Sequence, residues 1–227
     1  MKGVGGIMRT VVFDLDGTLA DTSADLLEAA NASFRQLGHG NVLDQRDTLT
    51  AFHGGRAMLR AGFERLGIGF DEADISREYP RLLAAYAEGI DTHTRLYPGA
   101  VAAVEALRSA GFATAICTNK PEGLAVELVR RLGISDLFAA LIGADTLSTR
   151  KPDAAPYVAA VERAGGVVAR SMLIGDTETD RKTGLAVGVP VVLVTFGPEG
   201  RGVSRLTPEA LLDHFDDLPG LAARFLP

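Results

Sequence analysis

The sequence predicts an α/β protein with a doubly wound parallel sheet and an inserted α-helical domain. Short apolar runs alternate with helical patterns from about residue 97 onward, which is typical of parallel sheets with helices on both faces. No strand pattern occurs between about residues 40 and 97. With 227 residues and 47% hydrophobic content, the chain can bury a sizeable core. We expect residues 1–20 and 97–227 to form the sheet domain, and residues 21–96 the helical domain.

The first predicted strand is the valine-rich run that ends at Asp14. An apolar run bounded by a turn signal is typical of a strand buried on both faces. Asp14 then lies at the carboxyl end of the strand, where open α/β sheets bind their ligands. A turn at Gly17 can bring Asp16 towards the same site. From these residues alone, a simple turn with helix-capping acids is the favoured interpretation of both carboxylates, because most Asp-Gly pairs form such turns.

The inserted segment reads as a bundle of helices. Residues 21–25 carry the Thr-x-x-Asp pattern of a helix start, and apolar residues follow at helical spacing up to Phe34. Further helical patterns are separated by glycines and cover residues 45–51, 55–66 and 71–88.

The second half of the chain supplies the rest of the sheet. The predicted strands are residues 113–117, 139–143, 171–175 and 190–195, and the predicted helices are residues 99–110, 121–132, 153–165 and 179–187. We expect Thr207–Pro208–Glu209 to open a final helix that runs to about Phe215.

Polar residues follow several of these strands, and the carboxyl ends of parallel strands share one edge of a sheet. Thr118 and Asn119 come after strand 113–117, where they either bind an anion or cap the next helix. Lys151 lies at a helix entrance, where a cation opposes the helix dipole. It therefore faces either an anion or the solvent.

Two more acids follow strand 171–175. Asp176 and Asp180 either reach the same edge of the sheet or cap the next helix, and Asp145 has no clear role. Helix caps do not require the whole set of polar residues at one edge. A Mg²⁺ site held by carboxylates and a substrate phosphate, with Lys151 balancing charge, accounts for all of them together.

Four segments resemble the ordered motifs of the haloacid dehalogenase (HAD) superfamily. They are Asp14–Thr18, Thr118–Asn119, Lys151–Pro152 and Gly175–Asp180. The inserted helices resemble the small helical (C1-type) cap of that superfamily, and the chain is most similar to its phosphoglycolate phosphatase-like branch. The resemblance implies a Rossmann-like core with a helical cap domain. One departure is Ala154 in Lys151–Pro152–Asp153–Ala154, because relatives often follow the lysine with Pro-x-Pro.

The resemblance also implies roles for the two acids of the first motif. Asp14 would be the nucleophile that forms an aspartyl phosphate, and it would ligate Mg²⁺. Asp16 would protonate the leaving alkoxide and then deprotonate the attacking water, while its backbone carbonyl ligates Mg²⁺. A carboxylic acid at the Asp16 position favours phosphoryl transfer from oxygen over cleavage of carbon–halogen or carbon–phosphorus bonds.

The later motifs would hold the phosphate and the metal. Thr118 and the Asn119 N–H would bind phosphate oxygens, and Lys151 would neutralise charge on the phosphoryl group and the nucleophile. Asp176 would be the second metal carboxylate, with Asp180 orienting metal-bound waters or Lys151.

Substrate choice is expected to depend on the cap. Gly55 and Arg56 lie where related caps project a glycine-containing loop into the active site. Arg56 is a candidate to bind a substrate carboxylate or a second phosphate. An exposed arginine at a helix start is an equally good interpretation.

Charge and composition indicate which kinds of binding partner to expect. The net charge is −6 with no long basic cluster, which disfavours nucleic acid. No apolar run reaches the roughly 18 residues of a membrane span, and no signal peptide is recognisable. We therefore expect a cytoplasmic protein, and we expect it to be a monomer or a homodimer.

The single cysteine, Cys117, excludes an internal disulfide. Either Met1 or Met8 could be the initiator.

The sequence thus predicts a Mg²⁺-dependent phosphatase that hydrolyses a small-metabolite phosphomonoester through an aspartyl phosphate. A phosphoglycolate-like compound is one candidate substrate. A phosphomutase of the β-phosphoglucomutase type is the first alternative. A phospho-signalling or binding module is the second, although the order of the motifs and the helical insertion argue against it.

Overall fold

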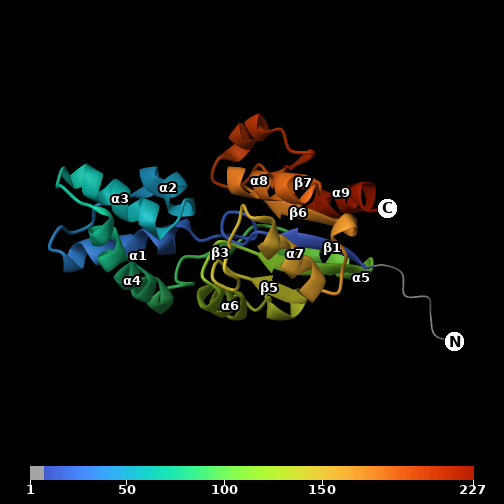
Figure 1. The fold of residues 1–227 in the computed structure, drawn as a ribbon, viewed down its shortest axis with the longest axis horizontal. Coiled ribbons are helices and arrows are strands. Elements are labelled where there is room, and N and C mark those ends of the chain that lie inside the picture. Colours follow the sequence, from blue (N-terminus) through green and yellow to red (C-terminus); the bar gives the residue numbers. More distant parts are fainter. Residues whose placement is uncertain (1–7) are drawn as a thin grey trace. The chain divides into compact units, whose positions relative to one another are not determined.

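The chain divides into two compact units in the computed structural model, which describes residues 8–227 (Figure 1). One unit contains the chain up to Ala20 together with Leu96–Pro227, and the other is Asp21–Arg95. The glycine-rich segment before Met8, and with it the choice between Met1 and Met8 as initiator, lies outside the described residues.

The first unit is built on a six-stranded parallel sheet with the order β5-β4-β1-β6-β7-β8. The central strand β1 pairs with β4 on one side and β6 on the other, so that Val11 lies opposite both Thr114 and Met172. The chain therefore reverses its winding direction at β1, where doubly wound sheets bind ligands. The strands are β1 Arg9–Phe13, β4 Phe112–Cys117, β5 Ala140–Ile142, β6 Ser171–Gly175, β7 Val191–Val194 and β8 Ala210–Leu212.

Helices flank this sheet, and the predicted α/β fold class is confirmed. Helix α7 packs on β1, β4 and β5, while α8 packs on β6, β7 and α7. Helix α5 contacts β4 and packs against α9. The bounds are α5 Ala100–Ser109, α6 Glu122–Arg131, α7 Ala154–Arg163, α8 Glu178–Val187 and α9 Leu218–Phe225.

Burial of β1 on both faces fixes the strand in the centre of the sheet. Val11, Val12 and Phe13 have no exposed surface, and full burial of such a side chain contributes about 1.5–3 kcal/mol. Val12 joins a cluster with Leu173 of β6 and Tyr157 of α7. The end of β1, which carries Asp14, is therefore held by the most buried part of the core.

The second unit is helical, with α1 Ser23–Gln36, α2 Thr48–Phe52, α3 Gly55–Leu66 and α4 Glu72–Glu88 (Figure 1). Helix α4 begins with a capping box between Asp71 and Asp74. Helices α1 and α3 meet closely at Gly62, since a Cβ placed there would lie 2.1 Å from Cζ of Phe34.

Helix α1 begins at Ser23 with Thr22 at its N-cap position, as the Thr-x-x-Asp pattern predicts, but the capping box of that pattern is not formed. Thr22 makes no side-chain cap bond, and the Asp21 carboxylate accepts the backbone N–H of Ser23 instead (3.0 Å). Asp25 is buried and accepts the backbone N–H groups of His93 and Thr94 (3.0 and 2.8 Å). These two donors are distant in sequence, so the local pattern could not reveal them.

Two short strands were not expected. β2 (Ala20–Asp21) and β3 (Arg95–Leu96) form a two-stranded sheet where the chain leaves and re-enters the first unit. Two-residue strands carry no apolar alternation, because a period of two needs several residues to be visible.

The predicted helix from Thr207 to about Phe215 is also wrong. Residues 210–212 form β8, which pairs with β7 at the sheet edge. Thr207 has a positive φ of 49°, which does not fit an α-helix start. The Glu209 carboxylate accepts the Val191 N–H (2.8 Å) and thereby fixes the start of β8 on the sheet. The last helix is α9, which begins only at Leu218.

Candidate active site

The loop after β1 carries the first two acids. The backbone N–H of Asp14 donates to the Ile174 carbonyl (2.9 Å), so Asp14 continues the sheet, and its side chain is buried. The N–H of Leu15 donates to Oδ1 of Asp14 (2.7 Å). Gly17 follows with φ of 80°, and a Cβ there would lie 2.3 Å from Oδ2 of Asp176. The turn therefore requires glycine both for its conformation and for the space beside Asp176.

Lys151 connects two of the predicted carboxylates. Its Nζ lies 2.9 Å from Oδ2 of Asp14 and 2.7 Å from Oδ1 of Asp180. Burial lowers the pKa of the Lys151 ammonium, but the two adjacent carboxylates outweigh burial and raise it above its ordinary value. Lys151 is therefore a buried cation. The interpretation that it is a solvated loop lysine is wrong, because only 2% of its surface is exposed.

Asp176, directly after β6, has one carboxylate oxygen in use. Thr18 donates its hydroxyl to Oδ1 of Asp176 (2.7 Å). Oδ2 is buried and has no hydrogen-bond partner among the described residues. Burial, together with the neighbouring charges of Asp180 and Asp14, raises the pKa of Asp176 well above its ordinary value. A buried carboxylate oxygen without a donor is costly unless a cation or water satisfies it.

Asp180 is fully occupied by protein groups. Its Oδ1 accepts Lys151, and its Oδ2 accepts the Thr177 hydroxyl (2.6 Å) and the backbone N–H groups of Thr177 and Asp176 (3.1 and 3.2 Å). Asp180 also takes part in the capping box that starts α8. Both interpretations of Asp180 thus apply, since it caps the helix and also lies at the edge of the sheet.

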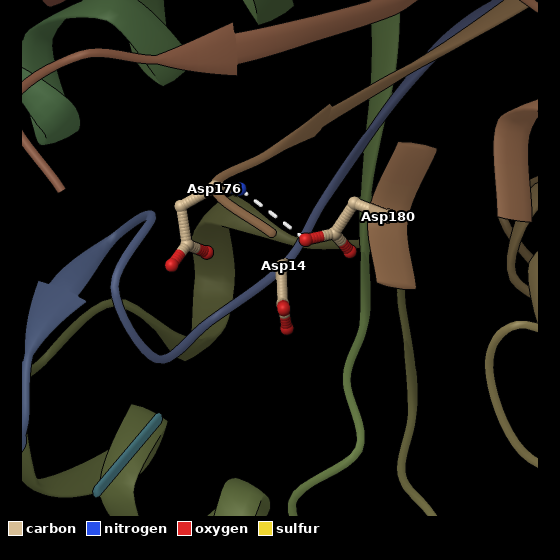
Figure 2. Close-up of side chains that lie close together, drawn as sticks. All are labelled: Asp14, Asp176 and Asp180. Atoms are coloured by element: carbon tan, nitrogen blue, oxygen red, sulfur yellow. Dashed lines mark hydrogen bonds between the residues drawn. The ribbon is translucent and has the colours of Figure 1, made fainter. Parts of the chain in front are cut away.

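The ligand atoms of Asp14, Asp176 and Asp180, called the acidic cluster below, lie within 4.8 Å of one another. Figure 2 shows these three side chains in one small region, with the Asp176 N–H donating to the Asp180 carboxylate (3.2 Å). Burial raises the pKa of Asp14 to about 6, against the lowering effect of Lys151. Three buried carboxylates lie together, only two of them pair with the Lys151 ammonium, and oxygen ligands are those that Mg²⁺ prefers. The donor set therefore fits a divalent cation.

Asp16 lies outside the acidic cluster and pairs with a residue that we did not predict. Both of its carboxylate oxygens accept Nζ of Lys120, at 2.8 and 3.1 Å. Lys120 is buried and precedes Pro121 at the entrance of α6. The argument that singled out Lys151, a lysine before a proline at a helix entrance, applies equally to Lys120 and could have found it.

Thr118 and Asn119 follow β4, as expected, but neither caps α6. The Thr118 hydroxyl accepts the Lys120 N–H (3.2 Å), and the Asn119 amide donates to the Lys151 carbonyl (3.0 Å). The cap comes from Asp145, whose carboxylate accepts the Glu122 N–H (2.7 Å). Asp145 thereby gains a structural role that its sequence context did not reveal.

Gly197, in the loop after β7, was also not predicted. A Cβ at this position would lie 2.8 Å from the Gly17 carbonyl oxygen and 3.1 Å from Cβ of Asp176. The absence of a side chain thus lets this loop pack against both the β1 loop and a member of the acidic cluster.

Gly55 and Arg56 begin α3 in the helical unit. Arg56 Nη1 donates to the Ser76 hydroxyl (3.3 Å), and its guanidinium lies 4.9 Å from the centre of the Tyr79 ring. These contacts are within the helical unit, and a role in substrate recognition stays a prediction. Within residues 8–227, no helix is long and apolar enough to span a membrane.

The buried acids and the buried lysine lie at the switch point of a doubly wound sheet, where α/β proteins bind their ligands. The haloacid dehalogenase-like hydrolase family matches residues 11–194, and the chain belongs to this family. The predicted superfamily and the prediction of an enzyme are confirmed.

Individual relatives agree with this assignment. A phosphoglycolate phosphatase of Mesorhizobium japonicum is 38% identical over 92% of both chains. One of Agrobacterium fabrum is 38% identical over 90% of this chain and 88% of its own. The crystal structure of a predicted phosphoglycolate phosphatase from Haemophilus somnus superposes with a TM-score of 0.84 at 23% identity, covering 94% of this chain and 97% of its own. The chain is a phosphatase of the haloacid dehalogenase-like type.

Proposed function

We propose that this phosphatase is Mg²⁺-dependent and hydrolyses a small phosphorylated metabolite through an aspartyl phosphate on Asp14. The observation that carries the proposal is the acidic cluster, where a nucleophilic carboxylate lies beside a buried ammonium and a second carboxylate keeps one oxygen without a protein donor. A purely structural ion-pair network does not need that unsatisfied oxygen.

The reaction divides into two displacements at phosphorus. An oxygen of Asp14 forms a bond to the phosphorus while the bond from phosphorus to the substrate oxygen breaks, and Asp16 gives its proton to the departing alkoxide. In the second step a water oxygen attacks the phosphorus, Asp16 accepts the proton of this water, and the bond to Asp14 breaks. Inorganic phosphate leaves, Asp14 is again a free carboxylate, and Asp16 again carries its proton.

Asp14, Asp176 and the backbone carbonyl of Asp16 would hold Mg²⁺. The unsatisfied Oδ2 of Asp176 supports this assignment, whereas both oxygens of Asp180 already accept protein donors. Asp180 therefore fits the role of orienting Lys151. When bound, the cation supplies electrostatic shielding between the negative phosphate and the carboxylate nucleophile.

Three further residues would hold the phosphate. Lys151 adds a buried positive charge beside Asp14, which reduces the repulsion between a carboxylate and a phosphate dianion. The Thr118 hydroxyl and the Asn119 N–H would donate to phosphate oxygens. The bond from the Asn119 side chain to the Lys151 carbonyl links these two phosphate-binding segments.

The substrate is proposed to be 2-phosphoglycolate or a similarly small phosphorylated acid. The supporting observation is the name of the relatives at 38% identity, which cover most of this chain. Gly55 and Arg56 of the helical unit are the proposed recognition residues. An arginine can bind the carboxylate of such a substrate through two parallel hydrogen bonds.

A phosphatase screen tests the proposal. The purified chain is incubated with a panel of phosphorylated metabolites, with Mg²⁺ or with EDTA, and released phosphate is measured for the wild type and Asp14→Asn. We expect Mg²⁺-dependent turnover of small phosphorylated acids by the wild type alone. Phosphate release by Asp14→Asn at the wild-type rate, or an isomerised sugar phosphate in place of free phosphate, would contradict the proposal.

The substrate assignment has its own control. Arg56→Ala should lose activity selectively on carboxylate-bearing substrates and keep it on a neutral phosphate ester. Arg46→Ala serves as the matched variant, because Arg46 is an exposed arginine of the same unit that pairs with Asp44. An equal loss on both substrate types would show that Arg56 does not recognise the substrate carboxylate.

A further inference from the structure

We propose that Lys120 is a positioning residue that fixes the carboxylate of Asp16 for proton transfer. This inference rests on the proposed function in one respect, the role of Asp16 as the proton-transfer residue. It adds a residue outside the four motifs, and a specific task for a buried lysine that the proposed reaction steps leave unused.

The contact between the two side chains is short and two-pronged. Nζ of Lys120 lies 2.8 Å from Oδ1 and 3.1 Å from Oδ2 of Asp16, and their side chains are 3% and 18% exposed. A carboxylate held through both oxygens has little freedom to rotate. In a site that excludes most water, such an ion pair is also screened far less than one on the surface.

The backbone of Lys120 is anchored on both sides. Its N–H donates to the Thr118 hydroxyl (3.2 Å), and its carbonyl accepts the N–H of Ala144 (2.9 Å). Lys120 therefore belongs to a rigid turn between β4 and α6. Through the ion pair, this turn sets the position of a side chain that lies in the loop after β1.

The two buried lysines of the site divide their partners. Lys151 pairs with Asp14 and Asp180, whereas Lys120 pairs with Asp16. The two proposed reacting carboxylates thus pair with different ammonium groups. Because Lys120 acts on the proton-transfer residue and not on the phosphate, its loss should slow turnover without weakening substrate binding.

The test is a double-mutant cycle on the full chain. The steady-state kinetics of the wild type, Lys120→Met, Asp16→Asn and the double variant are measured with Mg²⁺ on the best substrate of the screen. Methionine is close to lysine in length and lacks the charge. Lys182→Met is the control, since Lys182 is an exposed lysine of α8 that pairs with the exposed Glu178.

We expect Lys120→Met to lower kcat by roughly ten- to hundredfold, a part of the 10²- to 10⁴-fold that general acid–base catalysis supplies. KM should stay within about threefold, and the double variant should be no slower than Asp16→Asn by more than about threefold, because both changes remove the same function. Lys120→Arg should restore part of kcat because it keeps the charge.

Besides an unchanged rate in Lys120→Met, two results would overturn the inference. One is a large rise in KM with unchanged kcat in Lys120→Met, which would place Lys120 on the substrate. The other is independent, multiplicative losses in the double variant, which would separate Lys120 from Asp16. Circular dichroism checks that each variant folds, and Lys120→Gln replaces the methionine variant in the same cycle if methionine prevents folding.

The failure of this inference is distinguishable from failure of the proposed function. If the wild type releases no phosphate with Mg²⁺, the proposed function is wrong. If the wild type is active and Lys120→Met matches it, only the role of Lys120 is wrong.

Discussion

Replacing Asp14 by asparagine is expected to stabilise the metal-free protein at pH 7, although it abolishes the proposed nucleophile. Burial and the neighbouring carboxylates raise the pKa of Asp14 from 3.8 to about 6. The folded protein therefore binds more protons than the unfolded chain between these two pH values, and the stability of the wild type falls as the pH rises through this window. Above it, the ionised carboxylate costs the folded state free energy that a neutral amide does not.

The magnitude follows from the shift in pKa. A shift of about two units corresponds to roughly 3 kcal/mol at pH 7, at about 1.4 kcal/mol per unit. We expect Asp14→Asn to raise the free energy of unfolding by about 1–3 kcal/mol. The shift already includes the attraction of Lys151, which lowers the pKa of Asp14. The difference should shrink as the pH falls from 6 towards 4, because the wild-type carboxyl then becomes neutral as well.

The assay is urea denaturation followed by circular dichroism at pH 4, 5, 6 and 7 in EDTA. Asp136→Asn is the matched control, because Asp136 is an exposed aspartate of the same unit. Addition of Mg²⁺ should stabilise the wild type by about 2.7 kcal/mol at a hundredfold excess over its dissociation constant, and Asp14→Asn by less. If Asp14→Asn is no more stable than the wild type at pH 7 in EDTA, the ionised Asp14 carboxylate does not cost the folded state free energy, and the reasoning is wrong.

Three other variants test separate parts of the structure. Gly197→Ala should weaken Mg²⁺ binding at least several-fold in calorimetry, because its Cβ would press on the Gly17 carbonyl and on Asp176. Gly202→Ala is the control in the 3-10 helix that follows this loop and should bind Mg²⁺ normally, since a Cβ at Gly202 would meet only one side-chain nitrogen, 3.9 Å away. Asp25→Ala should destabilise the protein by about 1–3 kcal/mol in thermal or urea unfolding, because it leaves buried N–H donors before β3 without their acceptor; an unchanged midpoint would contradict this. Gly62→Ala should cost about 1–3 kcal/mol in the same measurement, since the new methyl group would overlap the ring of Phe34, and a rise in stability would show that the ring moves aside freely.

The longer strands that the sequence predicted have enough buried residues to show a pattern. β1 and β4 are apolar runs that are buried along nearly their whole length. β8 has only three residues, and its strand conformation depends on pairing with β7 and on the bond between Glu209 and Val191. Such contacts are tertiary, so a local pattern of Thr-Pro-Glu followed by apolar residues favours a helix start instead.

The site was predictable to the extent that its residues lie in the loops that follow strands. Asp14, Lys151 and Asp176 come from three different loops, and the rule that parallel strands end at one edge was sufficient to bring them together. The rule does not assign pairs, so it could not tell that Lys151 bonds Asp14 and Asp180 while Asp16 bonds another lysine.

Gly197 is a residue of the site that could not be predicted from the sequence. Its importance lies in the absence of a side chain near Gly17 and Asp176, and the sequence of the loop after β7 contains no sign of that proximity. The close approach of distant backbone segments depends on the packed sheet, and only the structure reveals it.

The central claim, that Asp14 receives the phosphoryl group, is tested most directly by trapping the intermediate. The wild type is mixed with ³²P-labelled substrate and Mg²⁺, quenched in acid within milliseconds, digested and analysed by mass spectrometry and hydroxylamine treatment. We expect a hydroxylamine-labile label on the peptide that contains Asp14, which forms and decays at rates that support turnover and is absent in Asp14→Asn. A label on another residue would contradict this claim. So would turnover with no labelled protein under conditions in which hydrolysis of the phosphoenzyme limits the rate.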